Sequence, residues 1–151
     1  MCHSLPLESA MTTTSPSLPD WIPPLRSGAR TLPAGRWWDV VQVPSSTSAH
    51  VLGRLDARSG PVIEIQERAV VRWLVAPRAT AGWQRLPGVR VIGHGHYVAI
   101  PPAEWRASRD GAPPLRWLVP PRGRCLTEAE ALREALAATL LAPAVWEARH
   151  A

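Results

Sequence analysis

Prolines set the strongest limit on how this chain can fold. The sequence holds 17 of them among 151 residues, and a proline inside a helix or a central strand removes a backbone hydrogen bond and biases the preceding residue towards extended geometry. Residues 1–33 are rich in Ser, Thr and Pro, so this segment cannot form a continuous helix. We therefore expect 1–33 to be a mobile tail, with Trp21, Ile22 and Leu25 docking onto the folded part.

The remaining sequence predicts several short strands and two helices. Strands are expected at 35–44, 61–65, 69–77, 89–93, 96–102 and 114–121, where Val, Ile, Leu, Trp and Tyr recur between turn residues. A first helix is expected between a cap at Ser45 or Ser46 and Gly60, with Ala49, Leu52 and Leu55 along one side. The safest helix lies in 126–143, where Thr127 and Glu130 have capping-box spacing and Pro143 follows the end.

This order of elements indicates an α+β fold with a mostly antiparallel sheet packed by two helices, one of them C-terminal. The length suits one domain, which we place at 34–143, followed by a C-terminal tail at 144–151. Twelve residues are expected in the core: Trp37, Val40, Val62, Ile63, Trp73, Val75, Val91, Val98, Ile100, Trp117, Leu132 and Leu136.

The composition limits the cellular setting and the kind of partner. The sequence has no run of 18 apolar residues and no signal-peptide pattern, so we expect a cytoplasmic chain without membrane contact. The native start could be Met1 or Met11. The net charge is +5, and every basic residue is Arg. Arginine together with eight Trp suits phosphate contacts and base stacking, although a soluble basic surface explains the same charge.

A Gly-His-Gly-His segment at 93–96 raises the question of a metal or catalytic site. In an extended chain His94 and His96 point to one face and could supply two ligands. A third ligand would have to come from Asp39, Glu64 or Glu104. The alternative is that both glycines adopt positive φ in a tight turn, with polar residues at its tip. No nucleophile elbow, P-loop, dinucleotide fingerprint or HExxH motif is present.

The stretch that contains this segment, "LPGVRVIGHGHYVAIPP" at 86–102, carries a family resemblance. Its Pro, Gly, Val and Tyr positions, followed by Pro101 and Pro102, resemble the closing part of the bifunctional DNA primase/polymerase N-terminal domain, a branch of the archaeo-eukaryotic primase superfamily. The opening "WWDVVQVP" at 37–44 is similar to the start of small actinobacterial members. The resemblance implies an RRM-like, primase-like sheet. It covers 35–142 in patches, and only the patch at 85–102 is specific.

The same resemblance implies nucleotidyl transfer, which needs paired acids on one strand and a third acid to hold two Mg²⁺ or Mn²⁺ ions. Where the paired acids would stand, "PVIEI" offers Glu64 alone, and Asp39 has no second acid two residues later. One carboxylate cannot hold two such ions, because hard cations need several oxygen ligands. Asp39 and Glu64 are thus weak catalytic candidates. We expect a degenerate copy that needs no cofactor unless it is active.

Three functional hypotheses remain open. The first is a degenerate domain that binds DNA or a nucleotide through Arg68, Arg72, Arg90 and Arg116, with Trp38 as the exposed aromatic. The second is a protein-interaction or regulatory module that does not bind nucleic acid. The third is an active primase/polymerase whose missing acids come from another subunit.

Overall fold

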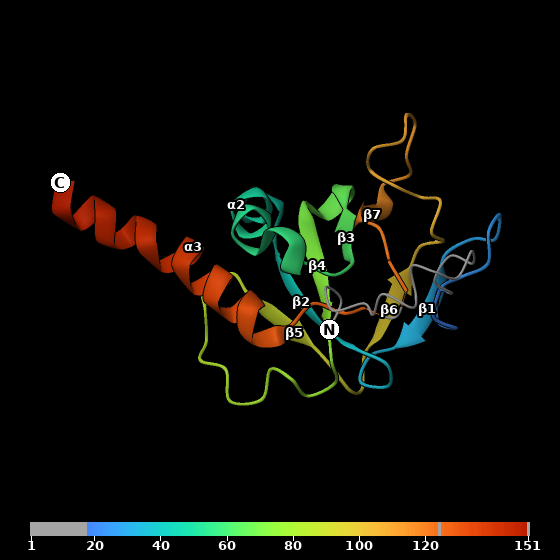
Figure 1. Cartoon of the computed structure of the whole chain (residues 1–151), viewed down its shortest axis with the longest axis horizontal. Helices are drawn as coiled ribbons and strands as arrows, with labels where there is room; N and C mark the ends of the chain where they lie inside the picture. The colour runs from blue at the N-terminus through green and yellow to red at the C-terminus, as the bar shows by residue number, and fades with distance from the viewer. Residues whose placement is uncertain (1–17, 124, 151) are drawn as a thin grey trace, which may run out of the picture.

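The computed structural model describes residues 18–123 and 125–150, with side chains described as far as Leu141. Its described part is an α+β domain in three layers (Figure 1). Two helices lie on one side of a five-stranded sheet, and a two-stranded sheet lies on the other side. The predicted fold class, with a mostly antiparallel sheet packed by two helices, is confirmed.

The five-stranded sheet has the order β5-β2-β4-β3-β7, and every neighbouring pair is antiparallel. Its strands are β2 (Asp39–Pro44), β3 (Val62–Ile65), β4 (Val70–Val75), β5 (Arg90–Ile92) and β7 (Leu115–Val119). The hairpin of β3 and β4 turns through the short 3-10 helix Gln66–Arg68. Apolar residues on both faces of β2 and β4 suit the interior positions that these two strands occupy in the sheet.

The helix α2 (Ser45–Leu55) connects β2 to β3, but these strands are not neighbours because β4 lies between them. This is the split β-α-β arrangement of ferredoxin-like sheets. With β5 on the far side of β2, four strands follow the ferredoxin-like order, and β7 extends the sheet at its other edge. A loop of turns replaces the second crossover helix between β4 and β5.

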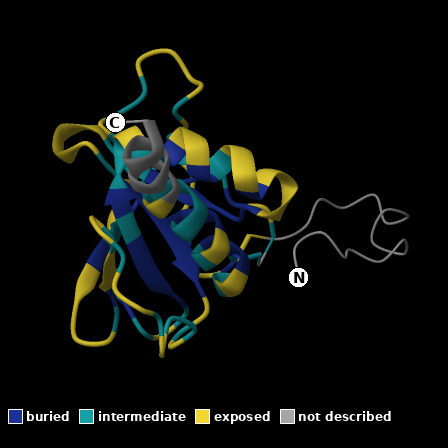
Figure 2. Ribbon diagram, turned by 90° about the vertical axis from the view of Figure 1, so that its left-hand side faces the viewer, coloured by how far each residue is buried: buried dark blue, intermediate teal, exposed yellow. Residues whose placement is uncertain are grey.

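One face of the sheet packs against α2 and α3 (Ala129–His150). Val41, Val43, Val71, Trp73 and Val75 point to these helices and are fully buried. The helices contribute Val51, Leu55, Ala131, Leu132, Ala135 and Leu136. Figure 2 shows the buried residues concentrated in the strands, with exposed residues on the outer turns of the helices.

The other face is covered by β1 (Arg30–Pro33), β6 (Tyr97–Ile100) and the segment before β1. Trp21, Ile22 and Leu32 are buried there, so residues 18–33 do not behave as the tail that we predicted. The docking of Trp21 and Ile22 is confirmed, whereas Leu25 is exposed. Prolines excluded a helix here but did not exclude a short strand at a sheet edge, where fewer hydrogen bonds are needed. Residues 1–17 lie outside the described part.

Ten of the twelve predicted core residues are buried, and Trp37 and Val91 are not. Trp38 is fully buried while its neighbour Trp37 is half-buried, so the expected inward and outward assignment of this pair is reversed. Val91 lies in the edge strand β5, where no further strand covers it. Alternation identifies two faces of a strand, but it does not say which face or which edge is covered.

The predicted helix ends differ from the observed ones. Pro44 precedes the first residue of α2, and no side chain caps this end. The buried side of α2 is Ser48, Val51 and Leu55, so the prediction was right for Leu55 and one position off for the other two residues. At the other helix, α3 continues across Pro143 to His150, so 144–150 is helical rather than a tail. Good helix formers on both sides of Pro143 favour continuation despite the lost hydrogen bond.

Thr127 does not form the predicted capping box with Glu130. Its Oγ1 accepts a hydrogen bond from the backbone N–H of Gly60 at 2.8 Å, and its own N–H donates to the carbonyl of Leu74 at 3.0 Å. Glu130 instead pairs with Arg133. A Cβ atom on Gly60 would lie 2.6 Å from the Thr127 nitrogen. Gly60 therefore permits a close backbone approach rather than ending α2.

Candidate functional site

Three polar side chains form a row across one end of the sheet, on the face opposite the helices. Gln42 in β2 pairs with Arg72 in β4 on one side and with Arg90 in β5 on the other. Each of the three lies two positions along its strand from a core residue on the face opposite the helices, namely Val40, Leu74 or Ile92. Because residues two positions apart in a strand share a face, all three polar side chains lie on that face. Antiparallel pairing therefore brings together side chains that are up to 48 residues apart.

Arg72 is the central member of this row. It is only 9% exposed, and its Nε donates a hydrogen bond to Oε1 of Gln42 at 2.8 Å. Among the described residues, Arg72 makes no ion pair. Burial, followed by the charges of Arg68 and Arg90, lowers the pKa of the Arg72 guanidinium from its usual value. The fold thus holds a poorly solvated cation beside two more cations.

This arrangement can bind an anion. A buried charge without a counter-ion is costly, and two like charges nearby add to the cost. An anion with several oxygen atoms removes both penalties, and the planar guanidinium fits phosphate by paired hydrogen bonds. Arg68 and Arg90 are exposed and their charges act on Arg72, so both are close enough to contribute to the same anion site. We refer to Arg68, Arg72 and Arg90 as the arginine cluster.

Arg116 lies apart from the arginine cluster. It is directly opposite Glu64 in the pairing of β7 with β3, and its Nε lies 2.9 Å from Oε1 of Glu64. Each of the two side chains lies two positions from a residue that packs on the helices, so both lie on the helix-covered face of the sheet. The carboxylate of Glu64 thus already has a basic partner, and Arg116 already has an acidic one.

The predicted exposed aromatic, Trp38, has no exposed surface. That part of the prediction is wrong, because Trp38 shares the inward face with Val40 beneath the Trp21 ring. Among the aromatic residues whose side chains the structure describes, Tyr97 is the most exposed, at 71%. It begins β6 opposite Pro33, and its alternation with the buried Val98 was visible in the sequence.

Asp39 and Glu64 do not meet. Asp39 pairs with Val75 and Glu64 with Val71, four residues apart along β4 and on its two opposite sides. Strand dimensions place them on the order of 15 Å apart. Oδ2 of Asp39 accepts the backbone N–H of Arg78 at 2.8 Å, and Gly93 packs closely on the same carboxylate. Asp39 therefore organises the two loops at its end of the sheet.

His94 and His96 lie in a turn rather than in extended chain. The N–H of His96 donates to the carbonyl of Gly93 at 3.2 Å, and Gly95 has a φ of 96°. The predicted positive φ is confirmed for Gly95 and wrong for Gly93. Both histidines are exposed, and no group of three metal-ligating residues occurs within 18–123 and 125–150.

Compared with known proteins, the chain matches no protein-family model, no curated protein and no solved structure. Across the described residues, no helix combines the length and the apolar character needed to cross a membrane. The arginine cluster is therefore interpreted from its own geometry. Sequence reasoning selected its three arginines but missed Gln42, because only strand pairing reveals the side chain that orients Arg72.

Proposed function

We propose that this domain binds the phosphate groups of a nucleic acid through Arg68, Arg72 and Arg90. The observation that carries the proposal is the buried Arg72 guanidinium, which has an orienting partner in Gln42 and no acidic partner among the described residues. A chain with a net charge of +5 also attracts polyanions over a longer range. Contacts of this kind recognise the backbone and carry no sequence information.

Single-stranded nucleic acid is the form that the arginine cluster fits best. Its members lie on two strands and on the one-turn 3-10 helix Gln66–Arg68, so the cluster offers no α-helix to the major groove of a duplex. The sheet face that would present aromatic platforms is covered by β1, β6 and Trp21, which leaves phosphate contacts as the main attraction. We accordingly assign no base-reading role to Trp38.

A relation to the bifunctional primase/polymerase domain stays part of the proposal. Its support is the 85–102 patch together with the split β-α-β order of the sheet. A binding role is favoured over catalysis because Asp39 and Glu64 are far apart and each has a structural partner. A metal would be required only by the catalytic hypothesis.

The test is a titration of fluorescent single-stranded and duplex DNA at two salt concentrations. Three phosphate contacts predict a slope of about −2 for log affinity against log salt on single strands, or roughly a twentyfold loss between 50 and 200 mM. The variants Arg68→Gln and Arg90→Gln should each reduce this slope by about 0.7. Both residues are exposed, so neither substitution disturbs the core.

The matched controls are Arg54→Gln and Arg58→Gln, which remove the same charge from exposed positions beside the helices. If the controls weaken binding as much as the cluster variants do, the cluster is not the site. Absence of binding at low salt would leave the protein-interaction hypothesis as the better explanation. If the protein extends a primer in the presence of Mn²⁺ and the Glu64→Ala variant does not, the hypothesis of an active primase/polymerase would be supported instead.

A further inference from the structure

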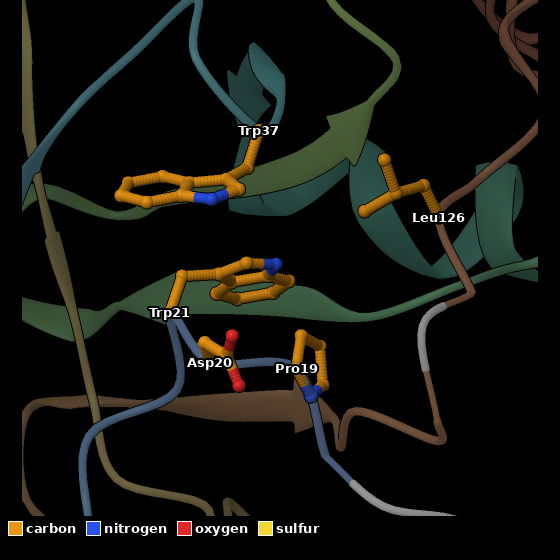
Figure 3. Close-up of a pocket in the computed structure, with 5 residues that line it drawn as sticks. All are labelled: Pro19, Asp20, Trp21, Trp37 and Leu126. Atoms are coloured by element: carbon orange, nitrogen blue, oxygen red, sulfur yellow. The ribbon is translucent and has the colours of Figure 1, made fainter.

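A small pocket lies at the opposite end of the sheet from the arginine cluster. Trp21, Trp37, Pro19, Asp20 and Leu126 line it, and its volume is about 200 Å³. Figure 3 shows the indole rings of Trp21 and Trp37 one above the other across the pocket, with Pro19 and Asp20 on the Trp21 side and Leu126 at one end. Residues more than 100 positions apart in the sequence thus form one site.

The walls of this pocket are held in place by the core. Trp21 is buried, and its ring meets the ring of Trp38 edge-on with centroids 5.8 Å apart. Trp37 is half-buried and packs against the same cluster. The Arg36 guanidinium carbon lies 4.5 Å from the centroid of the Trp37 ring. Trp37 therefore already binds one cation through a ring face.

The chemistry of the lining favours a positively charged ligand. An indole face carries partial negative charge and attracts cations. The only charged side chain in the lining is the carboxylate of Asp20, which is exposed and makes no ion pair within the described part of the chain. An anion would meet repulsion from the Asp20 carboxylate and from the negative face of an indole ring.

The size of the pocket limits the ligand further. Drug-sized molecules occupy roughly 300–1,000 Å³, so a pocket of about 200 Å³ admits one compact group. A methylated ammonium group is compact, is weakly hydrated and places its charge against aromatic rings. A metal ion would prefer several oxygen ligands, which the lining does not provide.

We propose that the pocket between Trp21 and Trp37 binds a small organic cation, with Asp20 as its counter-ion. This site is separate from the arginine cluster in position and in charge, so it does not rest on the proposed nucleic-acid binding. The free cation and the same group on the side chain of a partner protein share this chemistry.

The experiment compares choline with 3,3-dimethylbutan-1-ol, a neutral molecule of the same shape, in titrations of the full chain followed by the indole N–H signals in NMR spectra. Choline should bind about tenfold more tightly than the alcohol, as one or two cation–π contacts predict. Trp37→Leu should abolish this preference and Trp37→Phe should retain part of it. Asp20→Asn should weaken choline binding severalfold, whereas Asp110→Asn, which removes an exposed carboxylate elsewhere, should not.

Equal binding of choline and the alcohol, or an Asp20→Asn variant with unchanged affinity, would overturn the proposal. So would unshifted indole signals up to about 100 mM choline, because even affinities weaker than millimolar would be detected. N-acetyl-trimethyllysine amide distinguishes the two sources: tighter binding than choline assigns the group to a partner's side chain, and weaker binding assigns it to a free cation. DNA affinity measured on the same variants separates this test from that of the arginine cluster.

Discussion

At the scale of single residues, Arg72 shows a conflict between stability and binding. Its guanidinium is buried next to Arg68 and Arg90, and its lowered pKa reports that the charged form is disfavoured in the folded state. Such a residue costs stability in the free protein, which is the reason for proposing that it binds an anion. The half-buried Gln42 that orients it can be hydrated if the guanidinium is removed.

We expect Arg72→Met to raise the free energy of unfolding by about 1 kcal/mol, because an apolar side chain replaces a poorly solvated charge. The same variant should lose most of its affinity for single-stranded DNA. Urea denaturation gives the first quantity and fluorescence anisotropy the second. A variant that is destabilised by more than about 1 kcal/mol would show that Arg72 stabilises the fold by its packing, and the binding argument would then depend on Arg68 and Arg90 alone.

At the scale of elements, the start of α3 is fixed to the sheet through Gly60 and Thr127. The two residues share a buried hydrogen bond of 2.8 Å, and the backbone at 126–127 passes where a Cβ of residue 60 would be. The Thr127 N–H also donates a hydrogen bond to the carbonyl of Leu74, a residue of β4 that lies past the first residue of β3 and has no partner in that strand. One glycine therefore determines how closely the helix can join the central strand.

Gly60→Ala should cost about 2–3 kcal/mol of folding free energy, because backbone atoms cannot move aside without distorting this contact. Gly53→Ala is the matched control, since nothing lies within 4 Å of its added Cβ in α2. That control should stabilise the protein by up to about 1 kcal/mol through helix propensity. Thermal melts of both variants check the difference, and equal melting temperatures would contradict the close approach.

The elements themselves were largely predictable, and their partners were not. Alternating Val, Ile and Trp identified β3, β4 and β7, and the short turn of four residues between β3 and β4 favours their pairing. The same alternation found β5 and β6 but could not tell that they enter different sheets. β1 was missed because its four residues end at Pro33, and its pairing with β6 depends on contacts almost 70 residues away in sequence.

At the scale of the whole molecule, the two proposed sites lie at opposite ends of one face of the sheet and would prefer ligands of opposite charge. Residue type alone pointed to Arg68, Arg72 and Arg90, whereas the pocket of Trp21 and Trp37 requires the fold, since its walls come from segments that no periodicity connects. The same holds for Trp38, whose orientation depends on which face of β2 the segment before β1 covers. Local sequence patterns identify side chains with useful chemistry, whereas packing between distant segments determines which of these side chains are exposed.

This separation predicts that the two ligands bind independently. Gln42 follows Trp37 by five positions, which corresponds to roughly 15 Å of nearly extended chain and lies beyond the range at which neighbouring substitutions couple strongly. A packed core lies between the two sites on the same sheet, and the structure shows no second conformation of the sheet that one ligand could stabilise. Without such a second conformation, binding at one site cannot change the affinity at the other. We expect the DNA dissociation constant with saturating choline to stay within about twofold of its value without choline.

The measurement is an anisotropy titration of single-stranded DNA with and without choline chloride, compared with the same concentration of sodium chloride to remove the effect of ionic strength. Trp37→Leu serves as the control that lacks the pocket and should give the same DNA affinity in both solutions. A change larger than about fivefold, seen in the wild type and absent from Trp37→Leu, corresponds to a coupling of about 1 kcal/mol. That result would mean that the sheet transmits strain between its ends, and the two sites would have to be treated as one binding surface.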